Sequence, residues 1–217
     1  MIDLALLDKT KTNALLLRHA ERDKMDIGQI EQPLNEAGIK NATILGAQLR
    51  GFVDYRFFSS PVDRCIQTVE CLQMGIFGNR EEKPNSHSDL LGRPGVFVVD
   101  RKNNAFRTSN CKDVVICQIA HKNLEGIRGS IEGTRILIDF VIEQMKLATP
   151  GSLLVFVTHD AIVAPVIFEL TGEQFDHDHW PDYSDGIIVE QTASSPDSQY
   201  RVIRNSTYYN LIKHSIG

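Results

Sequence analysis

Two short apolar runs, each followed by a histidine, place the strongest constraint on how this chain can fold. The run 15–17, within a strand predicted at about 13–18, is followed by Arg18 and His19, and the run at 153–157 is followed by Thr158 and His159. Runs of this length suit buried strands and are too short for a helix or a membrane span. A continuous apolar run is also typical of a parallel strand that is covered on both faces. We therefore predict two strands of a mostly parallel sheet, each ending next to a histidine.

The rest of the chain alternates helical and strand patterns, which is typical of an α/β fold. Ser60 and Pro61 have the residue types of a helix N-cap and first helical position, so a helix is predicted to begin there. No repeat, low-complexity tract or linker interrupts the pattern, so we expect one domain over 1–217. The further predicted helices lie at 36–50, 129–147 and 161–170, and the further predicted strands at 55–59, 96–99, 114–119, 187–189 and 200–203.

Composition excludes several classes of protein. The chain has 217 residues, is 42% hydrophobic and has a net charge of −5. It therefore lacks the excess of Lys and Arg that a general nucleic-acid binder uses to neutralise phosphates. The N-terminal residues carry acids where a signal peptide carries bases, and no apolar run is long enough to span a membrane. We expect a cytoplasmic protein that binds neither nucleic acid nor membranes, and its four cysteines are not spaced as a zinc site or a redox pair.

Charged side chains and histidines gather where the predicted strands end. In an open α/β sheet, ligands bind just beyond the carboxyl ends of the parallel strands. A parallel sheet would therefore bring Arg18, His19, Arg22, Arg64 and His159 to one edge. Guanidinium groups match phosphate oxygens and stabilise the charge of a transferring phosphoryl group. The pattern predicts a phosphate-binding pocket at this edge.

Phosphoryl transfer in such a pocket requires a nucleophile and a proton donor. His19 can attack phosphorus through a ring nitrogen and form a phosphohistidine, while His159 holds phosphate oxygens. Asp160 is our first candidate for the acid that protonates the leaving group. It could instead only cap the helix that follows it. Asp89 and Glu132 are the alternative acids from the middle of the chain.

Three stretches of the sequence resemble the signature segments of the histidine phosphatase superfamily, which has the phosphoglycerate mutase-like fold. A fourth stretch, at 33–38, resembles the start of that family's first helix. The resemblance implies a three-layer α/β/α sandwich, a phosphohistidine on His19, and phosphate held by Arg18, Arg64 and His159. The three signature stretches are Arg18-His19-Ala20-Glu21-Arg22, 59–68 and Thr158-His159-Asp160.

The chain combines features of the two branches of that family. Arg22 and the pair His159-Asp160 resemble the acid phosphatase and phytase branch, in which the aspartate is the proton donor. The short chain and the Ser-Ser-Pro-x-x-Arg stretch at 59–64 resemble the mutase branch, whose acid comes from the middle of the chain. Ala20 replaces the usual glycine after the nucleophile, and the long cap and paired cysteines of secreted acid phosphatases are missing from this sequence.

The function expected from these residues is hydrolysis of phosphomonoesters through His19, without a metal or other cofactor. The substrate would be a small phosphorylated molecule or a phosphoprotein, selected by the loops at 24–33, 78–113 and 173–186. A phosphomutase using the same phosphohistidine, or a protein that binds a phosphorylated ligand without turnover, are the alternatives. The acidic and histidine residues at 176–179 are expected to form a solvated or substrate-facing loop rather than a metal site. The sequence does not indicate an oligomeric state.

Overall fold

A computed structural model of the chain describes residues 2, 4–23, 32–78, 83–92, 95–192 and 199–211. The loop predicted at 24–33 lies outside these residues except for its last two. The residues 194–197, which the sequence predicts to connect the strands at 187–189 and 200–203, lie outside them entirely. None of the helices in the described ranges is long and apolar enough to cross a membrane.

The described residues form five α-helices, three short 3₁₀ helices and one seven-stranded sheet. The helices are α1 (Glu36–Gln48), α2 (Asp63–Phe77), α3 (Cys111–Ile119), α4 (Ser130–Lys146) and α5 (Asp160–Thr171), and the 3₁₀ helices are η1 (Leu4–Leu6), η2 (Asp89–Leu91) and η3 (Ala105–Arg107). The strands are β1 (Asn13–Arg18), β2 (Asp54–Ser59), β3 (Asn85–His87), β4 (Ser152–Thr158), β5 (Gly186–Gln191), β6 (Tyr200–Arg204) and β7 (Thr207–Leu211).

The sheet has a parallel half and an antiparallel half. Its strand order is β3-β2-β4-β1-β5-β6-β7. The strands β3, β2, β4 and β1 are parallel to one another, and β5, β6 and β7 continue the sheet from β1 by antiparallel pairing. The mostly parallel core that the apolar runs predicted is therefore confirmed, with antiparallel strands added at one side.

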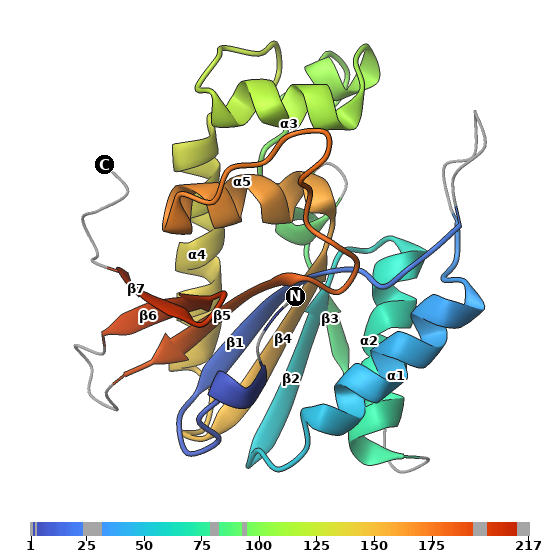
Figure 1. The fold of residues 1–217 in the computed structure, drawn as a ribbon, viewed down its shortest axis with the longest axis vertical. Helices are drawn as coiled ribbons and strands as arrows, with labels where there is room; N and C mark the ends of the chain where they lie inside the picture. Colours follow the sequence, from blue (N-terminus) through green and yellow to red (C-terminus); the bar gives the residue numbers. More distant parts are fainter. Residues whose placement is uncertain are drawn as a thin grey trace.

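Helices cover both faces of the sheet, which confirms the three-layer architecture. Alternate side chains of β1 point to opposite faces, as the two-residue period of a strand requires. Leu15 and Leu17 pack in one core with residues of α2, and Leu16 packs in the other with residues of α4 and α5. Figure 1 shows α1 and α2 together on one side of the sheet and α4 on the other.

The prediction of a strand at 114–119 was wrong, because this segment is helix α3. Its buried residues are Val114, Val115, Gln118 and Ile119, a spacing that places them on one side of a helix. The side chain of Asn110 caps the helix by accepting a hydrogen bond from the backbone N–H of Lys112 at 2.9 Å. A short run rich in β-branched residues suits either structure, and here tertiary packing selected the helix.

The strand predicted at 96–99 is also wrong. These residues form turns, and Val98 makes one isolated bridge to Ile127. The ring of Phe97 instead packs into the core at Gly133 of α4, where an added Cβ would lie 2.2 Å from the ring. The polar segment expected to be a loop around residue 86 contributes the short strand β3, and β7 was not predicted at all.

Helix α2 begins at Asp63, three residues after the predicted cap. Its N-cap residue is Val62, and no side chain caps it. Ser60 directly follows β2, and its backbone N–H donates to the carbonyl of Val157 at 3.0 Å. Its hydroxyl oxygen accepts a hydrogen bond from the backbone N–H of Val62 at 3.3 Å, so this side chain stays at the sheet edge, ahead of the helix.

Candidate active site

The carboxyl ends of β1, β2 and β4 meet at one edge of the sheet. The parallel register pairs Arg18 with Thr158 and Ser59 with Val157, so these three strands end level with one another. Just beyond this edge, the backbone N–H of His19 donates to the carbonyl of Thr158 at 2.8 Å. The sheet therefore brings residues that are far apart in sequence into fixed positions.

His19 is buried, with 2% of its surface exposed. Its Nδ1 lies 2.8 Å from the carbonyl oxygen of Ala20, which can only accept a hydrogen bond. Nδ1 therefore carries the proton, and the lone pair of the neutral ring is on Nε2. The pKa of His19 is lowered to about 3, mainly by burial and further by the charges of Arg64 and Arg18, against the opposing hydrogen bond to Ala20. The ring is therefore neutral at physiological pH.

His159 lies beside His19, with 5.6 Å between the ring centroids and 67° between the ring planes. Arg64 Nη2 lies 3.0 Å from Nδ1 of His159, and a guanidinium can only donate. The proton of a neutral His159 ring is therefore on Nε2, which is 2.9 Å from the hydroxyl oxygen of Ser60. Both Arg64 and His159 are buried, so this contact places a positive charge next to the two imidazoles.

Arg18 adds a second positive charge from the end of β1. Its Nη1 donates to the carbonyl of Pro181 at 2.6 Å, and its Nη2 pairs with Asp160 Oδ2 at 3.1 Å. The guanidinium carbon lies 4.1 Å from the centre of the Tyr183 ring, a cation–π arrangement. Its buried Nε has no hydrogen-bond partner in the described part of the chain. This side chain therefore retains a donor for a ligand.

Asp160 is held by three donors at the start of α5. Its carboxylate accepts from the backbone N–H of Ala161 at 2.9 Å and from Nε1 of Trp180 at 3.2 Å, besides the ion pair with Arg18. Burial raises the pKa of Asp160, but Arg18, Trp180 and His19 outweigh burial, so its pKa lies below the usual value. The carboxyl group is therefore ionised in this unliganded state.

The structure does not bring every predicted site residue into contact with the histidines. Arg22 Nη1 donates to the carbonyl of Asp23 at 2.9 Å and to Gln32 Oε1 at 3.2 Å. No contact joins its guanidinium to either imidazole within the described residues. Its buried Nε has no hydrogen-bond partner there, as for Arg18. Arg22 thus lies close to His19 in sequence, but its guanidinium bonds to Asp23 and Gln32.

The two alternative acids have partners of their own. Asp89, at the start of η2, pairs with Arg101 at 2.9 Å, and both side chains are 66% exposed. Glu132 forms an ion pair with Arg128, one helical turn before it, and its side chain is 53% exposed. Asp160 is therefore the candidate acid with a direct contact to a residue of the histidine and arginine cluster.

The segment 176–179 folds into a turn whose polar side chains bind different partners. The carboxylate of Asp176 accepts from the backbone N–H groups of Asp178 and His179, at 2.9 and 2.7 Å. His177 pairs with Asp113 at 3.0 Å, whereas His179 lies 3.2 Å from Glu173. No group of three or more metal-ligating side chains occurs among the residues that the structure describes.

Sequence reasoning missed the roles of Ser60 and Cys65 at the second histidine. Ser60 contacts His159 Nε2 through its hydroxyl group, and Cys65 Sγ lies 3.7 Å from the same nitrogen. Burial raises the pKa of the Cys65 thiol to about 12, which makes it a poor nucleophile. The position of Ser60 directly after a strand could have indicated its place at this edge.

Comparison with known proteins gives a family match for part of the chain and identifies solved structures with the same fold. The model of the histidine phosphatase superfamily (branch 1) matches residues 14–82, a segment that includes Arg18, His19 and Arg64. Phosphoglycerate mutase from Bacillus anthracis shares the fold with a TM-score of 0.53 and 14% identity, covering 94% of this chain and 93% of that chain. The segment 14–82 thus matches the model of this superfamily, and the fold is phosphoglycerate mutase-like, in agreement with the resemblance found in the sequence.

Further solved structures agree with this fold. YhfR from Bacillus stearothermophilus is 16% identical with a TM-score of 0.56, over 95% of this chain and 100% of that chain. A mutant phosphoserine phosphatase from Entamoeba histolytica, in complex with phosphoserine, is 16% identical with a TM-score of 0.52, over 93% and 95%. These identities are low, so the likeness establishes the fold alone. No curated protein matches the chain.

Proposed function

We propose that this protein is a phosphatase that hydrolyses small phosphomonoesters through a phosphohistidine on His19, without a metal. The observation that carries the proposal is the state of His19. Its ring is buried, neutral and hydrogen-bonded through Nδ1, which leaves Nε2 as the nucleophilic atom. His159 and the guanidinium groups of Arg18 and Arg64 surround it.

In the first step, Nε2 of His19 attacks phosphorus, a P–N bond forms, and the bond from phosphorus to the leaving oxygen breaks. Arg18 Nε and the side chains of Arg64 and His159 are suited to hold the phosphoryl oxygens, because guanidinium and imidazole N–H groups donate to developing negative charge. The leaving oxygen takes a proton from Asp160. In the second step, water attacks phosphorus, the P–N bond breaks, and Asp160 receives a proton of the water.

Asp160 must gain a proton before it can act as the acid, since it is ionised in the unliganded state. A bound phosphate dianion would compete for Arg18 and weaken the 3.1 Å ion pair with Asp160. It would also place negative charge beside the carboxylate. Both effects raise the pKa of a carboxyl group, so substrate binding favours uptake of the proton from solvent. Substrate binding thus favours the protonated form of Asp160 that acts as the acid.

Phosphoenzyme trapping tests this function. The purified chain is mixed with ³²P-labelled p-nitrophenyl phosphate in the presence of a chelator and quenched in alkali, which preserves phosphohistidine. We expect the wild type to carry label and His19→Ala to carry none. His121→Ala is the matched control, because the side chain of His121 is 54% exposed and pairs with Glu169 outside the site. Equal labelling of His19→Ala and wild type would overturn the proposal.

The same experiment separates the alternatives. A protein that only binds phosphorylated ligands would carry no covalent label. A phosphomutase would carry label but convert a panel of phosphorylated metabolites to isomers rather than releasing inorganic phosphate. We expect released phosphate in the presence of chelator, and loss of activity in chelator would contradict the metal-free mechanism.

A further inference from the structure

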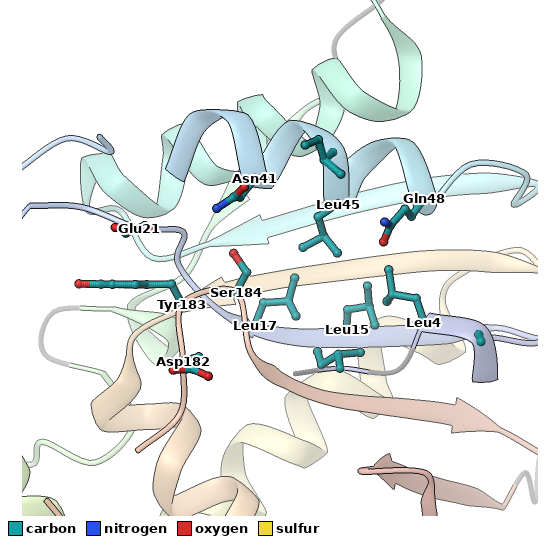
Figure 2. Close-up of a pocket in the computed structure, with 13 residues that line it drawn as sticks. Leu4, Leu15, Leu17, Glu21, Asn41, Leu45, Gln48, Asp182, Tyr183 and Ser184 are labelled. Carbon is teal, nitrogen blue, oxygen red and sulfur yellow. The ribbon is translucent and has the colours of Figure 1, made fainter. Parts of the chain in front are cut away.

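A cavity lies next to the candidate active site, between α1 and the sheet. It has a volume of about 660 Å³, which is within the usual range of small-molecule sites, roughly 300–1,000 Å³. Figure 2 shows leucine side chains of β1, η1 and α1 pointing into it. None of the residues assigned to catalysis or phosphate binding lines this space.

Helix α1 packs closely against α2, and the cavity lies on another side of α1. The close contact is made through Gly46 and Gly75, where an added Cβ would lie 2.2 Å from the carbonyl oxygen of Leu72 and 2.1 Å from that of Thr43. The cavity is lined by residues of α1, β1 and η1. Ile44 of α1 lines the cavity while remaining 48% exposed.

The lining is mostly apolar, with the polar side chains of Asn41 and Gln48 on the α1 side, and it is acidic at one end. The apolar walls are formed by Ile2, Leu4, Ala5, Leu15, Leu17, Ile44 and Leu45. Figure 2 shows Glu21, Asp182 and Ser184 grouped near Tyr183, at the opposite end from Leu4. No basic side chain among the described residues forms an ion pair with the carboxylate of Glu21 or that of Asp182. Glu21 accepts a hydrogen bond from Asn35 at 3.3 Å.

We propose that this cavity binds an amphiphile with an aliphatic body and a cationic, hydrogen-bond-donating head. The aliphatic body would remove the apolar walls and the exposed part of Ile44 from water, which is favourable in proportion to the area buried. The head would lie between the carboxylates of Glu21 and Asp182, which favour positive charge and repel an anionic head of the same size. Charge at this end therefore selects an amine over a fatty acid.

Tyr183 connects the cavity to the candidate active site. It lines the cavity, and its ring also lies 5.7 Å from the His19 ring and 4.1 Å from the Arg18 guanidinium carbon. The head of a ligand at the acidic end of the cavity would contact the Tyr183 ring, on which the Arg18 guanidinium stacks. The binding itself requires no catalysis, so it holds or fails independently of the proposed phosphatase activity.

Calorimetric titration of the full chain with decylamine, below its micelle concentration, tests the proposal. Decanoate has the same chain length and an anionic head, so it measures the contribution of charge. We expect decylamine to bind saturably with one molecule per chain, and decanoate to bind at least tenfold more weakly. Absence of saturable binding, or equal binding of the two compounds, would overturn the proposal.

Matched variants locate the binding. Ile39 and Ile44 are both 48% exposed on α1, but only Ile44 lines the cavity. We expect Ile44→Ser to weaken decylamine binding about five- to tenfold and Ile39→Ser to leave it unchanged. The double variant Glu21→Gln/Asp182→Asn should reduce the preference for decylamine over decanoate. Its control, Glu36→Gln on α1, should leave that preference unchanged. Equal effects of Ile44→Ser and Ile39→Ser would show nonspecific adsorption and refute the site.

Discussion

Two clusters of buried charge lie near each other in this molecule, and they differ in how completely their hydrogen bonds are satisfied. In the first, Arg204 of β6 donates through all five N–H groups, to Glu173, Asp185 and the carbonyl of Gly186, at distances of 2.6 to 3.0 Å. Two carboxylates surround one guanidinium. This network is complete without a ligand.

The second cluster, at the ends of the parallel strands, is incomplete. Arg18 and Arg64 bring two positive charges, and Asp160 is the carboxylate that pairs with Arg18, whereas Arg64 contacts His159. Arg18 Nε is buried without a partner in the described part of the chain. Buried charges are normally paired, so an excess of buried positive charge indicates a site for an anion. The comparison separates a cluster that holds the fold from a cluster suited to bind phosphate.

The two clusters are joined through the backbone. The carbonyl of Asp185 accepts a hydrogen bond from the backbone N–H of Arg18 at 2.9 Å, while the carboxylate of Asp185 binds Arg204. The antiparallel half of the sheet therefore positions a residue of the parallel half. Loss of catalysis and loss of stability have to be measured separately in variants of either cluster.

The largest effect after loss of His19 is expected for Asp160→Asn. Removal of a general acid typically lowers the rate about 10²–10⁴-fold. We expect this loss with a poor leaving group such as an alkyl phosphate, and a much smaller loss with p-nitrophenyl phosphate, whose leaving group needs no proton. Steady-state kinetics on both substrates measure the difference. Equal losses would remove Asp160 from this role, and a leaving-group-dependent loss in Asp89→Asn or Glu132→Gln would assign it there.

Arg204→Met breaks the complete network and should reduce the free energy of unfolding by about 3–5 kcal/mol, because it leaves two carboxylates buried without their partner. Burial raises the pKa values of Glu173 and Asp185, but Arg204 outweighs burial and holds both below their usual range. Urea denaturation measures the change. Arg56→Met is the control, since Arg56 contacts the carbonyl of Leu147 at the surface. A comparable loss in both variants would contradict a structural role for the network.

The pH dependence of the free energy of unfolding tests whether the His19 ring is buried and neutral in the folded chain. Because its pKa falls from 6.5 unfolded to about 3 folded, the unfolded chain binds more protons between these values. Stability from this group is full above pH 6.5 and is lost as the pH falls towards 3. The loss is about 2 kcal/mol near pH 5. Chemical denaturation should show that His19→Gln is less sensitive to acid than the wild type by this amount. Parallel profiles would refute the buried neutral state.

The smallest effect is expected for Trp180→Phe, which keeps a ring but removes the N–H that donates to Asp160 at 3.2 Å. A lost hydrogen bond of this kind costs roughly 0.5–1.5 kcal/mol, up to about tenfold in rate. The pKa of Asp160 should rise, because Trp180 helps to lower it. The alkaline limb of kcat/KM should therefore move to higher pH. An unchanged limb, or a further loss in the Asp160→Asn background, would contradict this positioning role.

Some features of this protein follow from the sequence because they depend on local pattern and one general rule. Continuous apolar runs specify buried parallel strands, and the ends of parallel strands meet at one edge. This reasoning predicted that His19, His159, Arg18 and Arg64 share that edge, and the structure brings these four together. The sequence alone also predicted the three-layer fold through its resemblance to a known family.

Other features were decided only by tertiary structure. The segment at 114–119 became a helix because its apolar residues face α5, although its composition suits a strand equally well. The pairing of Asp160 with Arg18 and Trp180 depends on contacts between distant segments, and the cavity beside α1 is lined by residues of η1, β1, α1 and 182–184. Local patterns determine which face of an element is buried, whereas the partner of a buried charge and the filling of a space depend on how all elements pack together.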